Sequence, residues 1–241
     1  MNPALVFCIF WLYSLGVYLT KRRLYPWALV GGPLPREPWR PGQEFSICIS
    51  PDYWWARRFK YRLQAAATAA ARADLLKAYV VTNNRMNLCL SMATALICLL
   101  AKAQWPGSLF FHVAAAVAVV RFFSRSYEIT YAFGLDVLQT ATAERTATGL
   151  RKEERVRLAL LSYFEIYLYA AAAYTALPAV RNAGEALTLS INVGTLTNVG
   201  YVYAMGPAGS PSFVLNIVFV QVITTLSLVV LSLAAYLARK D

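Results

Sequence analysis

The chain has 241 residues, of which 59% are hydrophobic and 15% charged, with a formal net charge of +11. This composition excludes an ordinary soluble domain and a disordered chain, and it predicts an all-α integral membrane protein. The positive charge would suit nucleic acid, but basic residues beside apolar segments more often record the positive-inside rule and contact with anionic headgroups. We therefore expect membrane lipids as partners and no nucleic acid.

The first apolar segment covers residues 3–20 and is followed at once by Lys21, Arg22 and Arg23. A cleaved signal peptide carries its positive charges before the apolar stretch. Residues 1–20 are therefore predicted to form a transmembrane anchor with its N-terminus outside.

Residues 21–85 are predicted to form a cytoplasmic proline-rich linker followed by a helix. Ser50, Pro51 and Asp52 supply a capping hydroxyl, a first-turn proline and an early acid, so the helix should begin there. Its first turns alternate aromatic and basic residues, which favours an interfacial helix at headgroup level over a connector with solvated charges. Trp54 and Trp55 should then lie at headgroup depth.

Residues 86–156 are predicted to form a two-helix transmembrane hairpin with a cytoplasmic extension. Apolar runs at about 87–104 and 108–124 flank a Trp-Pro-Gly turn, and each approaches the roughly 20 residues that cross a membrane. Arg121, Arg125 and Glu128 share one helix face, and their spacing favours an interfacial anchor with an ion pair over a voltage sensor.

Two further apolar runs cover about 157–177 and 212–237, which brings the predicted spans to five. Glu165 lies within the fourth run, where a carboxylate costs a few kcal/mol unless it is paired, protonated or in water. Either a polar contact inside the bundle or a position shallow enough to reach the inner headgroups would accommodate it.

The distribution of basic residues agrees with this topology. With the N-terminus outside, 21 of the 23 lysines and arginines fall on the cytoplasmic side or its border, and only Lys102 and Arg181 fall outside. The sequence thus predicts a multi-pass protein of the cell (inner) membrane whose C-terminus is cytoplasmic.

The segment from Glu185 to Tyr201, EALTLSINVGTLTNVGY, resembles the pore helix and selectivity filter of the potassium-channel-type pore superfamily. The matching positions are Ala186, Leu187, Ser190, Thr195, Thr197, Val199, Gly200 and Tyr201. The match ends where the family's second threonine is Asn198, its second filter glycine is Val202 and its aspartate is Tyr203. Gly194 stands where many members carry a glutamate that braces the filter.

This resemblance implies that residues 157–241 form a channel-like pore domain: a helix, a re-entrant pore helix over about 184–196 with its filter loop, and a helix. Four copies would surround one axis, and backbone carbonyls would replace the hydration shell of potassium or sodium as the permeant ion. The implied ion pathway is Thr197, Asn198, Val199, Gly200 and Tyr201. Because Val202 disfavours the left-handed backbone that glycine allows, we expect weak selectivity.

In the last run, Asn216, Thr224 and Ser227 follow helical spacing and give one face a polar character. Such a face would line the cavity of a pore, although Asn, Thr and Ser also bond to neighbouring helices in many membrane bundles.

No metal site or enzyme is indicated. The cysteines Cys8, Cys48, Cys89 and Cys98 form no CxxC motif and fit small core residues, and the single histidine, His112, fits a packed or hydrogen-bonded side chain. No nucleophile with a base occurs in a span. The sequence predicts a homotetrameric cation channel or channel-like pore without a cofactor, with a non-conducting membrane scaffold or regulatory protein on the same fold as the alternative.

Overall fold

A computed structural model describes residues 3–24, 45–65, 69–141, 150–200 and 211–229, and within these ranges it contains helices and no strand. The helices are α1 (Pro3–Leu24), α2 (Phe45–Ile49), α3 (Pro51–Ala65), α4 (Ala69–Gln104), α5 (Leu109–Ala141), α6 (Lys152–Tyr174), α7 (Ala183–Gly194) and α9 (Pro211–Leu226). The predicted all-α fold is therefore confirmed.

Three of these helices are long and apolar enough to cross a membrane: Arg72–Gln104 in α4, Leu109–Gly134 in α5, and α6. At 1.5 Å per residue, even a 23-residue helix such as α6 covers about 35 Å, more than a hydrocarbon core needs. The first and fifth predicted spans correspond to α1 and α9. Residues 230–237 of the fifth lie outside the described residues, so a total of five spans stays a prediction.

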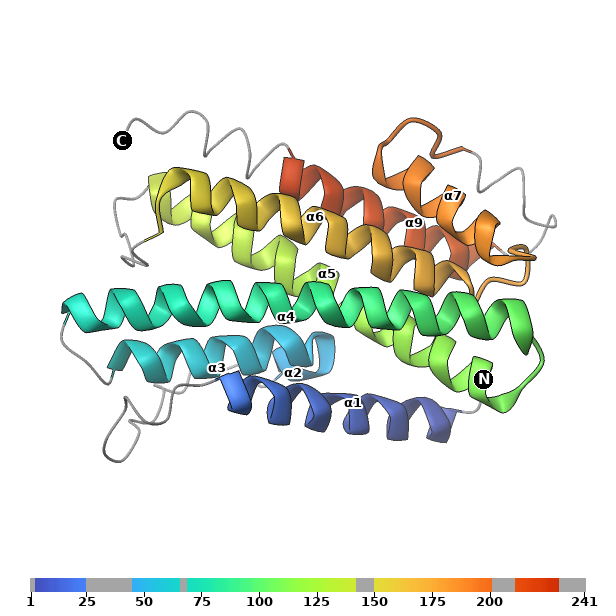
Figure 1. The fold of residues 1–241 in the computed structure, drawn as a ribbon, viewed down its shortest axis with the longest axis horizontal. Helices are drawn as coiled ribbons and strands as arrows, with labels where there is room; N and C mark the ends of the chain where they lie inside the picture. The colour runs from blue at the N-terminus through green and yellow to red at the C-terminus, as the bar shows by residue number, and fades with distance from the viewer. Residues whose placement is uncertain (1–2, 25–44, 66–68, 142–149, 201–210, 230–241) are drawn as a thin grey trace.

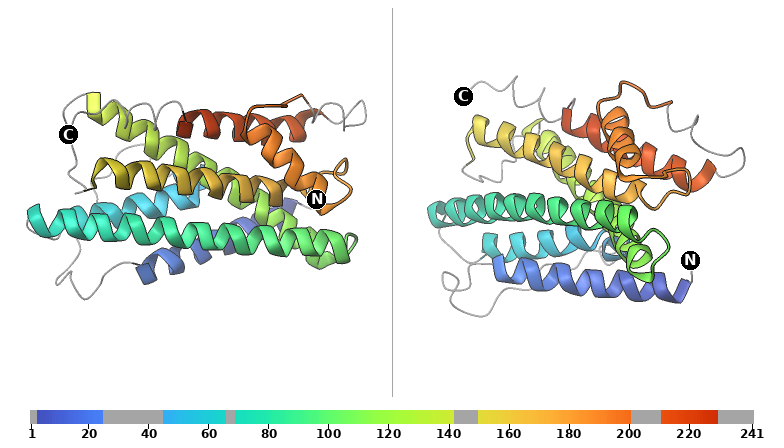
Figure 2. Two further views of the ribbon diagram at one scale, coloured as in Figure 1. Left: turned by 45° about the horizontal axis from the view of Figure 1, so that its top comes forward. Right: turned by 45° about the vertical axis from the view of Figure 1, so that its right-hand side comes forward.

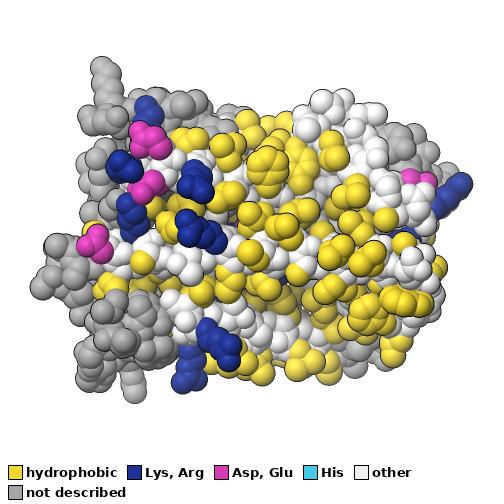
Figure 3. Space-filling view, in the orientation of Figure 1, with side chains coloured by type: hydrophobic (Ala, Val, Ile, Leu, Met, Phe, Trp, Pro, Cys, Tyr) yellow, Lys and Arg dark blue, Asp and Glu magenta, His cyan; other side chains and the backbone are white. Residues whose placement is uncertain are grey.

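The long helices lie side by side and alternate in direction (Figures 1 and 2). We call the end where α4 and α6 begin the inner end, and the opposite end, where α5 begins, the outer end. Hydrophobic side chains cover the middle of the face in Figure 3, and most of the basic side chains on that face lie toward the inner end. The last residues of α1 and α5 and the first residues of α4 and α6 therefore lie toward one end of the bundle, whereas the start of α3, which was also predicted to be cytoplasmic, lies beside the middle of α1 (Figure 1).

Helix α6 is the centre of the fold and packs against α4, α5, α7 and α9. Four consecutive alanines, Ala170–Ala173, are each at most 1% exposed, so neighbours surround the helix on all sides. Small side chains let helix backbones approach closely where lipid provides no hydrophobic driving force. Larger residues from α5, α7 and α9, among them Phe122, Leu189 and Ile217, complete the main core.

Helix α3 begins where the sequence predicted, because Ser50 Oγ accepts a hydrogen bond of 3.1 Å from the backbone N–H of Tyr53. It does not lie across the bundle as a helix on the membrane surface would. It runs alongside the first half of α4 (Figure 1), and its Phe59 and Leu63 are buried against Tyr79 and neighbouring residues of α4. The apolar part of its aromatic pattern therefore serves packing within the chain.

Candidate functional site

Helix α7 carries the pore-like sequence and lies at the outer end beside α6 and α9 (Figure 1). Asn182 caps it, since Asn182 Oδ1 accepts from the Glu185 N–H at 2.9 Å, while Glu185 Oε2 accepts from the Arg181 N–H at 2.6 Å. This reciprocal capping stabilises a helix of only 12 residues. Beyond α7 the chain reverses toward the outer end (Figure 2).

Uncharged hydrogen bonds join α7 to both neighbouring helices. Ser190 Oγ donates to the carbonyl of Tyr167 in α6 at 2.7 Å. Gln221 of α9 donates from Nε2 to the Ser190 carbonyl at 2.8 Å and accepts from the Tyr174 hydroxyl at 2.7 Å. Gln221 is fully buried, so one amide side chain connects α6, α7 and α9. We call Tyr167, Tyr174, Ser190 and Gln221 the amide network.

Gly194 lets the end of α7 approach α6 closely. A Cβ atom at this position would lie 2.5 Å from Tyr167 Cε1 and 2.9 Å from Gln221 Nε2, distances that real Cβ contacts do not show. The Tyr163 hydroxyl also donates to the Gly194 carbonyl at 3.2 Å. A tyrosine ring of α6 therefore packs directly against the backbone of α7 at Gly194.

The segment after α7 is curled back onto the helix end. The N–H groups of Thr197 and Leu196 donate to the carbonyls of Asn192 and Val193 at 3.2 and 3.1 Å, which is the pattern of a Schellman cap. Leu196 has a φ of 59°, the left-handed conformation that glycine usually occupies there. Helix α7 thus ends at Gly194, two residues before the predicted end, because the cap closes it.

The predicted ion-pathway residues are not buried in the single chain. Thr197, Asn198 and Gly200 are exposed, Val199 is half-buried, and Tyr201 lies outside the described residues. The Asn198 N–H also reaches the Asn192 carbonyl at 3.3 Å.

The predicted cavity-lining residues Asn216, Thr224 and Ser227 lie in different surroundings on the single chain. Asn216 is exposed, but Thr224 and Ser227 are buried and donate to carbonyls one turn earlier in their own helix, of Val220 and Ile223. On the single chain the three residues therefore differ in exposure, with Asn216 open and the two later residues covered by neighbouring helices. The residue of α9 that contacts α7 by a polar side chain is Gln221, which the sequence analysis did not single out.

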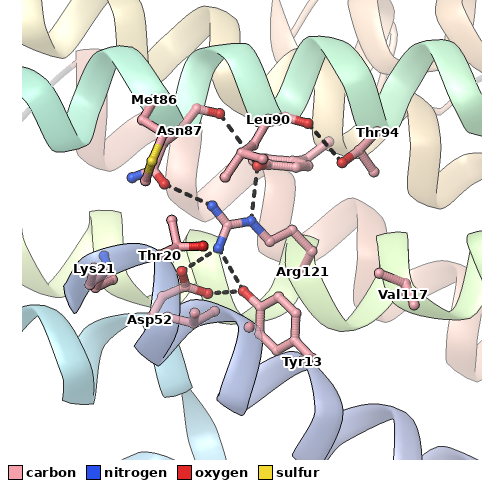
Figure 4. A pocket seen from close by; sticks show the side chains of 13 residues that line it. Tyr13, Thr20, Lys21, Asp52, Met86, Asn87, Leu90, Thr94, Val117 and Arg121 are labelled. Atoms are coloured by element: carbon pink, nitrogen blue, oxygen red, sulfur yellow. Dashed lines mark hydrogen bonds and ion pairs between the residues drawn. The ribbon is translucent and has the colours of Figure 1, made fainter. Parts of the chain in front are cut away.

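A second polar centre lies between α1, α3, α4, α5 and α6. Arg121 of α5 forms an ion pair with Asp52 of α3, and its guanidinium also donates to Asn87 Oδ1 and to the Tyr169 hydroxyl, both at 2.9 Å. The Tyr13 hydroxyl of α1 donates to Asp52 as well (Figure 4). Arg121 lies twelve residues into α5, which is about 18 Å along the helix.

A second group of ion pairs continues this centre. Arg125 pairs with Glu165 through two contacts of 2.6 and 2.9 Å and with Glu128 at 2.6 Å. Lys21 of α1 lies 3.5 Å from Glu128 and donates to Asn83 Oδ1 at 3.0 Å. Three basic and three acidic side chains therefore balance, and we call Lys21, Asp52, Arg121, Arg125, Glu128 and Glu165 the ionic network.

The ionic network contains the two features that the sequence analysis considered separately, the Arg121–Glu128 helix face and the membrane-span residue Glu165. The predicted ion pair on the Arg121–Glu128 face is confirmed, but the face is not an interfacial anchor, since Arg121 and Arg125 are only 6% and 4% exposed. Glu165 is fully buried and paired, so its contact lies inside the bundle. Burial also raises the pKa of the neighbouring Tyr53 to about 12.

The cysteine prediction is partly wrong, whereas the hydrogen bond predicted for the histidine is present. Cys98 is buried as expected, but Cys8, Cys48 and Cys89 are exposed on the single chain. His112 is exposed too, and its Nδ1 lies 2.7 Å from the Ser108 carbonyl. Among the residues that the structure describes, no group of three or more His, Cys, Asp or Glu side chains could hold a metal ion.

Comparison of the chain with protein-family models, with curated proteins and with solved structures finds no match. The description of the protein therefore depends on its own fold and polar side chains. The described residues form helices, three of them are long and apolar enough to cross a membrane, and the buried charged side chains balance.

Proposed function

We propose that this chain is the subunit of a homotetrameric, channel-like pore of the inner membrane, with a degenerate potassium-type filter and weak selectivity among monovalent cations. The observation that carries the proposal is the setting of α7: a short capped helix beside two longer helices, after which the chain reverses (Figure 1). A re-entrant pore helix requires this setting. The pore-like sequence lies on that element.

An uncovered face of the same element supports assembly. Leu187 and Ile191 of α7 are 40% and 53% exposed, and the polar Thr195, Thr197 and Asn198 continue this face. Backbone groups and hydroxyls at membrane depth need a protein or water environment. Neighbouring copies around a shared axis would supply both.

A non-conducting scaffold on the same fold is the second candidate, and the Schellman cap favours it. A potassium-type filter presents successive carbonyls to the ion, whereas here the Thr197 and Asn198 amides turn back to the Asn192 carbonyl. A subunit that kept this cap in the assembly would have no continuous ladder of carbonyls.

Liposome reconstitution distinguishes the two. A pore predicts a particle near four times 26.8 kDa and passage of both potassium and sodium, with an impermeant cation retained. The matched variant Asn198→Thr moves the segment toward the family pattern and should raise the preference for potassium. A tetramer that passes neither ion would support the scaffold, and a monomer would contradict a tetrameric assembly of either kind.

Cysteine accessibility tests the membrane orientation separately. After the exposed Cys8, Cys48 and Cys89 are replaced by serine, a cysteine at Ala183 should react with an impermeant reagent from outside and one at Thr146 from the cytoplasm. Reaction of both from one side would contradict the predicted topology.

A further inference from the structure

A cavity of about 230 Å³ lies between α1, α4 and α5, next to the ionic network (Figure 4). Its polar lining includes Lys21, Asp52, Asn87 and Arg121, and its apolar lining includes Leu90 and Val117. Figure 4 shows Lys21 and Asn87 toward one end of this space and Val117 and Thr94 toward the other. The cavity is therefore amphipathic along the direction of the helices.

One hydrogen-bond donor at the polar end of the cavity has no acceptor among the described residues. Asn87 is 2% exposed and its Oδ1 accepts from Arg121, but its Nδ2 finds no hydrogen-bond partner among the described residues. A buried amide N–H without an acceptor is costly, and such groups commonly meet a ligand or ordered water. Lys21 can add a donor, because Asn83 and Glu128 engage only two of the three that an ammonium carries.

The groups that this space offers to a ligand are hydrogen-bond donors. Lys21 lies beside Glu128 and Arg121 is paired with Asp52, so the network is charge-balanced. The spare N–H groups of Lys21 and Asn87 suit the oxygen atoms of a phosphate. Asp52 already accepts from Arg121, Tyr13 and Ser124. Its carboxylate is thereby neutralised within the protein.

The position of the cavity points to a lipid. Lys21 and Asn87 mark the inner ends of the apolar runs 3–20 and 87–104, which is headgroup depth for the inner leaflet. The exposed residues Gly16 and Leu90 also line the cavity, and a Cβ on Gly16 would meet nothing within 4 Å. The space thus opens sideways, where acyl chains would lie.

We propose that this cavity binds one anionic phospholipid of the inner leaflet, with a phosphate oxygen at Asn87 Nδ2 and Lys21 and an acyl chain along Gly16, Leu90 and Val117. The site uses the proposed membrane orientation and is independent of ion conduction. A bound lipid would bridge α1 and α4, beside the ion pair that connects α3 to α5.

Native mass spectrometry of the full chain in mild detergent tests this, with phosphatidylglycerol and phosphatidylcholine of identical acyl chains as probes. Asn87→Asp keeps an acceptor for Arg121 but removes the free donor and adds a negative charge. It should weaken phosphatidylglycerol binding about tenfold and reduce the preference for phosphatidylglycerol over phosphatidylcholine, because the added charge repels the anionic lipid more than the zwitterionic one. Gly16→Trp should fill the cavity and abolish retention of either lipid.

Gly134→Trp is the matched control, because Gly134 also faces open space but does not line the cavity; it should bind as the unaltered protein does. Melting curves of the lipid-free variants verify that each one folds. Equal binding of the two lipids, unchanged phosphatidylglycerol binding in Asn87→Asp, or binding of inorganic phosphate as tight as that of the lipid would each overturn the proposal.

Discussion

The amide network and the ionic network hold the same central helix, α6, by different chemistry. On one face of α6, a glutamine, a serine and tyrosines join it to α7 and α9 through uncharged hydrogen bonds. On the opposite face, Glu165 and Tyr169 of α6 meet two arginines of α5. Both centres are buried, so the difference lies in charge and not in access to water.

The two networks should contribute different amounts to the stability of the helix bundle. Interhelical hydrogen bonds between neutral groups contribute about 0.6 kcal/mol on average in a membrane protein, so they orient a segment without fixing it strongly. Removing one partner of a buried ion pair leaves an uncompensated charge, which costs about 3–5 kcal/mol. The helices joined by the ionic network should therefore be the rigid part of the chain and the α7 region the adaptable part.

The largest expected effect breaks the ionic network. Asp52→Asn keeps the side-chain shape but leaves Arg121 without its carboxylate, so the free energy of unfolding should fall by about 3 kcal/mol or more. Unfolding by dodecyl sulfate in mixed micelles measures it. Asp74→Asn, at an exposed position of α4, is the control.

Adding Arg121→Gln to Asp52→Asn removes the unpaired charge and should restore part of the stability. If Asp52→Asn lowered the free energy of unfolding no more than Asp74→Asn, the ionic network would not be the stronger of the two, and the comparison would be wrong.

The next effect tests the packing at Gly194. A methyl group there would meet the Tyr167 ring, so Gly194→Ala should cost about 1–3 kcal/mol. Tyr167→Leu in the same chain makes room, and the double variant should lose less than the sum of the two single losses. Gly134→Ala, where added atoms meet open space, should cost nothing. Additive losses would mean that the two residues do not meet as described.

A smaller effect is expected from the amide network itself. Gln221→Leu leaves the Ser190 carbonyl and the Tyr174 hydroxyl without their partner, which should cost about 1–2 kcal/mol. Asn216→Leu, at an exposed position of the same helix, serves as the control and should change stability little. A loss of stability at Gln221 as large as that at Asp52 would contradict the proposed difference between the two networks.

Local contacts were predictable from the sequence and distant ones were not. The helix start at Ser50 and the Arg125–Glu128 pair follow from spacings of three or four residues, which any helix brings together. Glu165 was recognised as a residue that needs a partner, but Arg125 is 40 residues away on another helix. Its identity depends on how the helices pack.

The same limit applies to Asp52 and Gly194. Asp52 was interpreted as favourable to its own helix dipole, while its partner Arg121 is 69 residues away. Gly194 was noted as a departure from the channel family, but the Tyr167 ring that requires a glycine there belongs to a different helix. The sequence of one helix does not show which residue of another helix will lie against it.

The smallest effect concerns the Schellman cap at the tip of α7. Leu196 has a left-handed backbone, which costs an L-residue about 1–2 kcal/mol relative to glycine. Glycine loses more entropy on folding, about 0.5–1 kcal/mol. Comparing Leu196→Gly with Leu196→Ala isolates the backbone effect, because both remove the 40%-exposed side chain. The glycine variant should be the more stable by about 0.5–1 kcal/mol in the same unfolding assay. An alanine variant of equal or greater stability would show that the segment leaves the cap, as an extended filter in an assembled pore requires.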